Sequence, residues 1–171
     1  MMTAFSLRIV QTLHEDHMAT MALLERLEGT LRRLGSGPAP ATDDPDLSRV
    51  LTDAVAVLEE EIGHHYQFEE DHLFPRFAEA IDAGIPNMLR DEHSAIRPVA
   101  RRMADLARGA RAGGFSDAEW GEFVRLGGEL IEREVFHIQK EEMGFLPALE
   151  QVIDPDDDGD LSMAYAELKG G

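Results

Sequence analysis

The chain carries one short pattern twice, and this repeat constrains the fold more than any other feature of the sequence. The copies are His65-x-x-x-Glu69 and His137-x-x-x-Glu141, each followed by a second glutamate and a Phe/Leu-Pro ending. On a helix, residues four apart share one face, with Cβ atoms roughly 5–6 Å apart, so an imidazole and a carboxylate can reach the same metal. Two copies in one register predict two halves of one metal site.

A further histidine precedes each copy. Two acidic residues directly precede His17 near the start of the chain, and two precede His93 in its middle. Each half of the chain is therefore predicted to contain a helix with one histidine, followed by a helix with His-x-x-x-Glu. Burying such groups without a metal would cost several kcal/mol for each unpaired charge. We therefore predict six metal ligands: His17, His65, Glu69, His93, His137 and Glu141.

The ligand types limit the choice of metal. Imidazole with carboxylate suits iron, zinc, manganese or copper, and six such ligands from four helices suit two ions bridged by carboxylates. We assign His17 and His65 to one ion and His93 and His137 to the other, with both glutamates bridging. The chain has no cysteine, which excludes disulfides, iron–sulfur clusters and thiolate zinc sites. Two such ions are the expected cofactor, and the residues alone leave iron, zinc, manganese and copper open.

Length and charge limit the partners. With 171 residues the chain is long enough for one domain with a proper core. Its net charge of −18 repels nucleic acid and anionic membranes. No stretch approaches the roughly 20 apolar residues of a membrane helix, and no signal peptide is evident. We expect a cytoplasmic monomer or homodimer whose partners are small ligands, without nucleic acid or membrane.

Apolar residues spaced by three and four predict four long helices and no strands. The first covers about 10–34 and ends in a glycine- and proline-rich turn, and the second starts at the Asp44-Pro45 cap, kinks or breaks near Pro75 and resumes to about 83. The third covers about 86–113 with a kink at Pro98, and the fourth opens with a capping box at Ser116-x-x-Glu119. The expected fold is all-α, an up-down-up-down four-helix bundle at residues 1–153, followed by an acidic tail at 154–171 that includes at most a short helix.

Six residues around the predicted site are candidates for additional ligands or for hydrogen-bond partners of the ligands: His14, Glu61, Glu70, His72, Arg97 and Glu142. Glu61 and His72 lie one turn from His65 and Glu69, whereas Glu70 and Glu142 can orient imidazoles or pair with Arg97. His64 is expected to point away from the site, and Tyr66 to pack at a helix boundary.

The tail contains a weaker metal signal. Residues 154–162 match the opening of an EF-hand calcium loop, but the twelfth position is Tyr165 where a bidentate glutamate is needed. Calcium at Asp154–Asp160 is therefore disfavoured, and a solvated acidic segment is the expected alternative.

With both repeats and their preceding histidines, residues 5–152 resemble hemerythrin-like proteins that carry the HHE cation-binding domain. The resemblance implies a non-haem di-iron site in a four-helix bundle. Oxygen-carrying hemerythrins have a second histidine where this chain has Arg97, and an aspartate five residues after the last-helix histidine where this chain has Glu141 four residues after His137. Reversible oxygen carriage is therefore disfavoured.

The resemblance implies binding, sensing or reduction of small diatomic or peroxide ligands such as O2, NO and H2O2. The alternative is an iron-responsive regulatory or iron-storage module without turnover. The sequence leaves open whether the protein is an enzyme that reduces peroxide or nitric oxide.

Overall fold

A computed structural model describes residues 5–170, and this part of the chain is helical with no strand. The first long helix, α1, is Arg8–Leu34, and α2 is Pro45–Glu60. The predicted start of α2 is confirmed: the Asp44 carboxylate accepts a hydrogen bond from the Leu47 amide at 3.1 Å, and Pro45 occupies the first turn. Proline suits this position because its missing N–H would have no partner there.

The second helical stretch continues past α2 without a break. Its segments succeed one another directly in the order α2, η1 (Glu61–His65), α3 (Tyr66–Phe68), η2 (Glu69–Leu73) and α4 (Phe74–Ala80). The segments η1 and η2 are π-helical. Of the kink or break predicted near Pro75, the break is wrong, because the helix continues and Pro75 falls in the first turn of α4, directly after a π turn.

The third and fourth helices are α5 (Gly84–Gly113) and α6 (Asp117–Lys140). Helix α5 continues through Pro98 and ends at Gly113, and the next residue, Gly114, has a φ of +80°, a conformation that glycine adopts easily. The predicted capping box is confirmed, since the Ser116 hydroxyl accepts from the Glu119 amide and the Glu119 carboxylate accepts from the Ser116 amide. The π segment η3 (Glu141–Phe145) and α7 (Leu146–Val152) extend α6.

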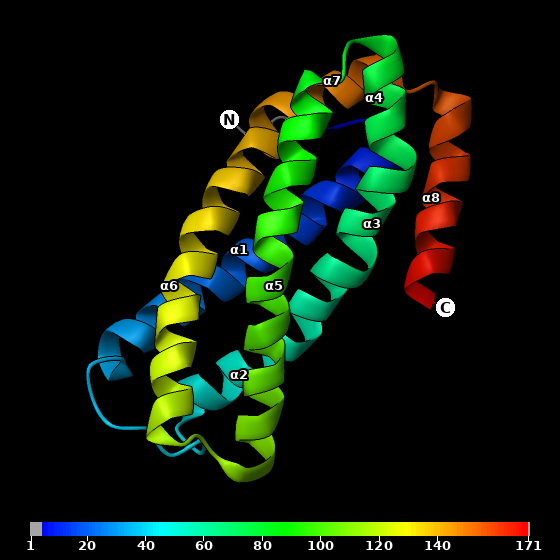
Figure 1. The fold of residues 1–171 in the computed structure, drawn as a ribbon. Helices are drawn as coiled ribbons and strands as arrows, with labels where there is room; N and C mark the ends of the chain where they lie inside the picture. Colours follow the sequence, from blue (N-terminus) through cyan, green and yellow to red (C-terminus); the bar gives the residue numbers. More distant parts are fainter. Residues whose placement is uncertain (1–4, 171) are drawn as a thin grey trace.

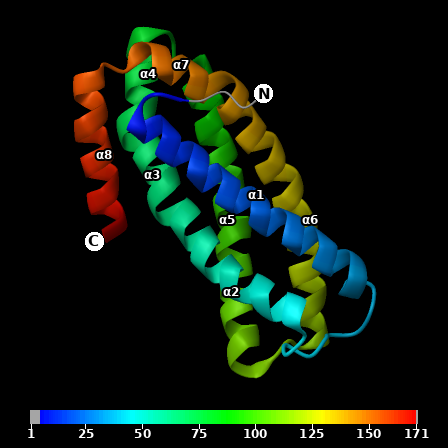
Figure 2. The same ribbon diagram turned by 180° about the vertical axis from the view of Figure 1, so that it is seen from behind.

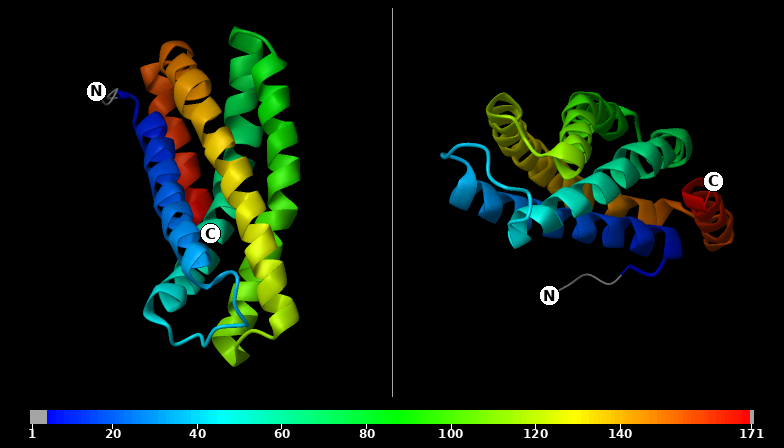
Figure 3. Two further views of the ribbon diagram at one scale, coloured as in Figure 1. Left: turned by 90° about the vertical axis from the view of Figure 1, so that its left-hand side faces the viewer. Right: turned by 90° about the horizontal axis from the view of Figure 1, so that it is seen from below.

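The long helices form a bundle in which α1 packs on α2 and α6, and α5 packs on the same two helices. Figure 1 shows α5 and α6 side by side with α1 behind them, and the end-on view in Figure 3 shows the helices around a common interior. The last helix, α8 (Pro155–Gly170), lies at the edge of the bundle next to α1 and η1 (Figure 2). The C-terminal segment is thus a packed helix, rather than a solvated tail. No helix within residues 5–170 is long and apolar enough to cross a membrane.

The interior has two apolar clusters separated by polar residues. The first cluster includes Leu24, Leu51, Ile96, Met103, Phe123 and Leu130. The second includes Ile9, Leu13, Phe68, Phe74, Leu89 and Phe145. Three histidines stand between the clusters along their helices: His17 follows Leu13 on α1, His93 follows Leu89 on α5, and His137 follows Leu130 on α6. The apolar packing on both sides keeps water from this polar layer.

Candidate metal centre

Six buried side chains of metal-ligating type form two groups that share two glutamates. The groups are His17, His65, Glu69 and Glu141, and Glu69, His93, His137 and Glu141. Within each group, one nitrogen or carboxylate oxygen from every residue lies within 4.8 Å of the others. All six side chains belong to residues that are at most 1% exposed. The fold therefore brings together the six residues that the sequence assigned to a metal site.

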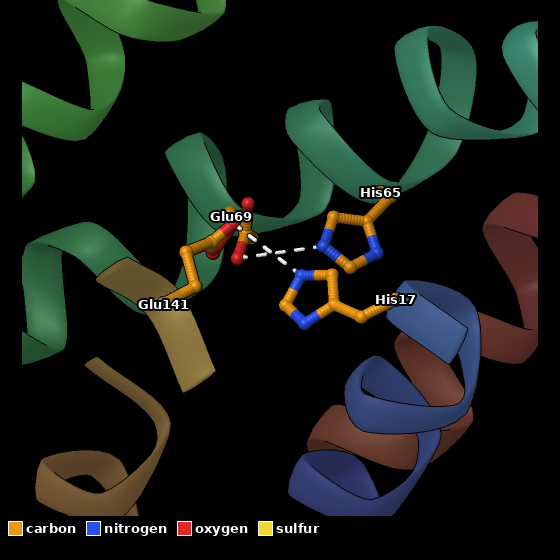
Figure 4. A group of neighbouring side chains, drawn as sticks. All are labelled: His17, His65, Glu69 and Glu141. Carbon is orange, nitrogen blue, oxygen red and sulfur yellow. Dashed lines mark ion pairs between the residues drawn. The ribbon is translucent and has the colours of Figure 1, made fainter. Parts of the chain in front are cut away.

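In the first group, His17 comes from α1 and His65 from the end of η1, and both rings point toward the two carboxylates (Figure 4). Nε2 of His65 lies 3.5 Å from a Glu69 oxygen, and Nε2 of His17 lies 3.5 Å from a Glu141 oxygen. The two rings have centroids 4.9 Å apart. The nitrogens of this group thus face one carboxylate from each repeat.

The second group uses the same carboxylates. Nε2 of His93 lies 3.3 Å from a Glu69 oxygen, and Nε2 of His137 lies 3.0 Å from a Glu141 oxygen. Each glutamate therefore faces one histidine from each group, a position from which a carboxylate can bridge two ions.

The π turns place three of these ligands. His65 ends η1, Glu69 begins η2 and Glu141 begins η3, and in each segment the backbone bond spans five residues, as from the Tyr66 amide to the Glu61 carbonyl. A π turn adds one residue to the helix and so rotates the residues beyond the turn about the helix axis. Such turns are frequent at functional sites.

In each histidine the nitrogen that faces away from the centre, Nδ1, is called the outer nitrogen. In two of the histidines it bonds to the glutamate that follows a shared glutamate in the sequence. Nδ1 of His93 lies 2.7 Å from Glu70, and Nδ1 of His17 lies 3.0 Å from Glu142. A carboxylate on Nδ1 holds a proton there, so that Nε2 is the nitrogen that would give its lone pair to a bound metal.

The outer nitrogens of His65 and His137 bond to acids from the preceding long helix. Each of these acids stands directly before the other histidine in that half of the chain. Nδ1 of His65 lies 3.1 Å from Asp16, and Nδ1 of His137 lies 2.8 Å from Glu92. The two halves thus share one scheme, in which every imidazole is oriented by an acid from another segment.

Each outer acid has a partner of its own. Arg97 donates to Glu70 at 2.8 Å, Lys140 donates to Glu92, and His14 bonds to Glu142. Asp16 accepts from Tyr165 at 2.5 Å and from Lys169 at 3.2 Å. These contacts restrain the acids, and the acids restrain the rings.

Charges of opposite sign face each other in this layer. Burial lowers the pKa of His17, but its contacts with Glu141 and Glu142 outweigh burial and raise that pKa to about 10. Burial also opposes ionisation of Glu141, yet His137 and the other partners hold the pKa of this carboxyl well below its usual range. The pKa of His65 and of His137 is raised well above normal by their carboxylate neighbours, against the effect of burial.

The inward atoms have no aligned hydrogen bond. Within residues 5–170, Nε2 of all four histidines and both oxygens of Glu69 and Glu141 are buried without a hydrogen-bond partner, although nitrogens and oxygens approach to 3.0–3.5 Å. Buried polar atoms are normally paired. Nitrogens and oxygens that converge without bonding to one another suit a bound cation, so the donor set fits metal.

A family comparison agrees with this geometry. The profile of the Hemerythrin HHE cation binding domain matches residues 8–149.

The chain belongs to the hemerythrin HHE family.

A comparison with curated proteins found no match to the chain. Membership of the hemerythrin HHE family and the buried His/Glu groups together identify a metal-binding domain suited to iron. The family match ends before α8, so that helix is an addition to the matched region.

The hemerythrin HHE domain of this chain has a second pair of buried acids. Glu61 and Glu134 are 3% and 1% exposed, and each has one oxygen without a hydrogen-bond partner in the described part of the chain. Tyr66 donates to Glu134, and Thr20 donates to Glu61 at 3.3 Å. Burial and the neighbouring charge of Glu61 raise the pKa of Glu134 to about 7.

The other sequence candidates lie around the groups. Glu70, Glu142 and Arg97 take part in the outer contacts, and His14 is a partner of Glu142. His72 packs its ring on Phe68 at a centroid distance of 4.8 Å. Glu61, His14 and His72 belong to neither group of ligand-type residues. His64 bonds to Glu60 at 3.3 Å, away from the centre.

Sequence reasoning did not assign roles to Asp16, Glu92 and Glu134. A signal existed for the first two, because an acid stands directly before His17 and before His93, in register with the repeat. Tyr66 packs at the boundary between η1 and α3, as expected, and it also stacks on His93 and donates to Glu134.

The acidic segment after residue 153 adopts no EF-hand loop. Residues Pro155–Gly170 are helical, and the Asp158 carboxylate accepts from the Arg8 and Ile9 amides at 2.9 and 2.8 Å. Asp158 therefore caps the start of α1.

Proposed function

We propose that the chain is a non-haem di-iron protein that binds, senses or reduces small ligands such as O2, NO or H2O2. The observation that carries this proposal is the sharing of Glu69 and Glu141 between two buried histidine pairs. In the proposed centre His17 and His65 would hold one iron, His93 and His137 would hold the other, and both glutamates would contribute to each position. We also propose that the bundle has the up-down-up-down order, which the packing of α1 and α5 on the same two helices supports.

Burial supports a small ligand. The six ligand residues are at most 1% exposed, and apolar clusters close the layer on both sides. A diatomic molecule or peroxide can enter such an interior during brief openings, whereas a larger organic molecule would require the helices to separate. Zinc or manganese would suit the same donors, but zinc has no redox chemistry and would supply no electrons.

The surrounding acids favour reduction over reversible oxygen carriage. When bound, two irons supply two electrons and open positions for a ligand. Reduction of peroxide or oxygen also needs protons, and Tyr66 and Glu134 are a buried phenol and a carboxyl with a pKa of about 7 next to the His93 and His137 rings. An uncharged carboxyl can give a proton to a developing oxyanion.

An iron-responsive module without turnover is the second candidate. The ligands come from α1, the α2–α4 stretch, α5 and the α6–α7 stretch, so metal binding would join every long helix of the bundle. The free energy of metal binding then adds to the free energy of unfolding, so the protein would be more stable when the metal site is occupied.

The first test is elemental analysis of protein purified without added metal. We expect two irons per chain, and visible absorption of the ferric protein that changes with azide, peroxide or nitric oxide. His137→Ala should reduce the metal content, whereas His64→Ala, a matched control on η1, should not. Absence of metal, or one zinc per chain, would refute the di-iron proposal.

Turnover is measured separately. Catalytic consumption of H2O2 or NO with an added reductant, well beyond two electrons per chain, supports reduction. If binding changes the spectrum but consumption stops after one equivalent, the sensing or storage alternative is supported.

A further inference from the structure

Helix α8 contacts the candidate centre through one carboxylate. Asp16 lies on α1 and accepts from Nδ1 of His65 at 3.1 Å. The same oxygen, Oδ2, accepts from the Tyr165 hydroxyl at 2.5 Å, and Oδ1 accepts from the Lys169 ammonium at 3.2 Å. A chain of hydrogen bonds therefore runs from α8 to an inner-facing histidine.

This arrangement differs from that of the other three histidines. Their outer acids are held by His14, Arg97 and Lys140, which lie within the region matched by the family profile. Asp16 is held by Tyr165 and Lys169, which lie beyond it. Two hydrogen bonds from this added helix thus act on one histidine of the four.

Tyr165 is fixed at this place by packing. It is 1% exposed, stacks on Phe68 at 4.7 Å and meets the His65 ring edge-on at 6.5 Å. Lys169 lies over the Tyr165 ring at 4.4 Å and also pairs with Glu60 at 3.1 Å. A buried aromatic ring held on several sides places its hydroxyl accurately.

The other end of α8 is fastened independently. Asp158 caps two amides at the start of α1, and Leu161 is buried in the second apolar cluster. Loss of the Tyr165 hydroxyl alone should therefore leave the helix docked. Burial opposes ionisation of Asp16, but its bonds to His65, Tyr165 and Lys169 outweigh burial and lower its pKa to about 2, so the acceptor remains charged at neutral pH.

We propose that Tyr165 is a positioning residue that acts through Asp16 on His65, so that α8 adjusts the metal position of His17 and His65 independently of the position of His93 and His137. The proposal rests on the di-iron function proposed above. Hydrogen-bond partners of metal ligands commonly change metal affinity by about 10- to 100-fold. The two positions should therefore respond differently when this contact is removed.

The test uses Tyr165→Phe, which removes the hydroxyl and keeps the ring, with Met163→Ala as a control at a 64% exposed position of the same helix. Each protein is loaded with iron and mixed with an excess of chelator. We expect Tyr165→Phe to bind two irons and to release one of them about tenfold faster than the wild type, with the other unchanged. Met163→Ala should release both at wild-type rates.

Two further measurements separate positioning from loosening. Amide hydrogen exchange of α8 should be the same in Tyr165→Phe and in the wild type. In the metal-free proteins, the NMR signal of the His65 Nδ1 proton should shift in Tyr165→Phe, while those of His93 and His137 stay in place. Three results for Tyr165→Phe would overturn the proposal. Both irons could leave at wild-type rates, the release of both could be accelerated equally, or the His65 signal could stay unshifted.

Failure of the proposed di-iron function can be distinguished from failure of the Tyr165 proposal. If the wild type binds no iron, the di-iron proposal fails, and the NMR measurement still decides whether Tyr165 acts on His65. If Tyr165→Phe does not fold, Lys169→Met removes another bond to Asp16 from a partly exposed position and should shift the same His65 signal.

Discussion

The ring of Tyr66 lies flat on the imidazole of His93, with centroids 3.7 Å apart and planes 6° apart. The Arg97 guanidinium lies 5.6 Å from the centroid of the Tyr66 ring and donates to Glu70, which in turn holds His93. Arg97 lies one helical turn after His93 on α5. In this chain that position supports the orientation of His93.

Tyr66→Phe should keep the stacking and lose the bond to Glu134. An acceptor left buried without its partner costs about 1–3 kcal/mol. We expect the free energy of unfolding of the metal-free protein to fall by about that amount in a urea titration. Tyr66→Phe combined with Glu134→Leu should lose less than the sum of the single changes. A free energy of unfolding of Tyr66→Phe within about 0.5 kcal/mol of the wild-type value would show that this bond contributes little.

Glu134 should make the metal-free protein less stable as the pH rises. Its pKa is raised by burial and by Glu61 from 4.5 to about 7, so the native state binds more protons than the unfolded state between these values. Stability therefore falls across that window, by up to about 3 kcal/mol at about 1.4 kcal/mol per pKa unit. Glu134→Gln should reduce this slope relative to the wild type, measured by urea unfolding of both proteins from pH 4.5 to 6.5. The histidines, whose unfolded pKa is about 6.5, contribute to both curves and cancel in the comparison. An identical slope in the variant would contradict the assignment.

The shared glutamates should be required for both ions. Glu141→Ala and Glu69→Ala are each expected to leave less than one iron per chain, because each carboxylate faces a histidine of both groups. Glu150→Ala, which removes a carboxylate that bonds to the Ser6 and Leu7 amides, is the control and should keep two. If either variant at the centre retained one tightly bound iron, that glutamate would serve a single ion.

Glu92 should affect metal affinity without touching the metal. Glu92→Ala removes the acceptor of the His137 Nδ1 proton, and we expect iron affinity to fall by about 10- to 100-fold. Asp91→Ala removes the same charge from an exposed neighbour and serves as the matched control in a competition titration with a chelator. Equal effects of the two variants would indicate a general influence of charge instead of the specific bond.

Two adjacent glycines of α6 should respond differently to alanine. Gly128 is exposed and has open space around an added Cβ, so Gly128→Ala should stabilise the helix by about 0.5–1 kcal/mol. At the buried Gly127 a Cβ would lie 2.7 Å from Leu31 Cδ1, and that side chain must move. Gly127→Ala should therefore gain less, as thermal unfolding would show. A larger gain at Gly127 would mean that the interior has more room than this distance implies.

The sequence by itself determined the helical class, the caps at Asp44 and Ser116, and the pairing of His65 with Glu69 and of His137 with Glu141. Each of these depends on spacing along a single helix, where neighbours in the chain are neighbours in space. Only the tertiary structure decided that Pro75 leaves the helix unbroken, that Asp16 and Glu92 orient His65 and His137, that Tyr66 stacks on His93, and that Tyr165 reaches Asp16. Apart from the course of the helix at Pro75, these are contacts between residues from different helices. Their geometry depends on how the helices rotate and pack, which local periodicity does not encode.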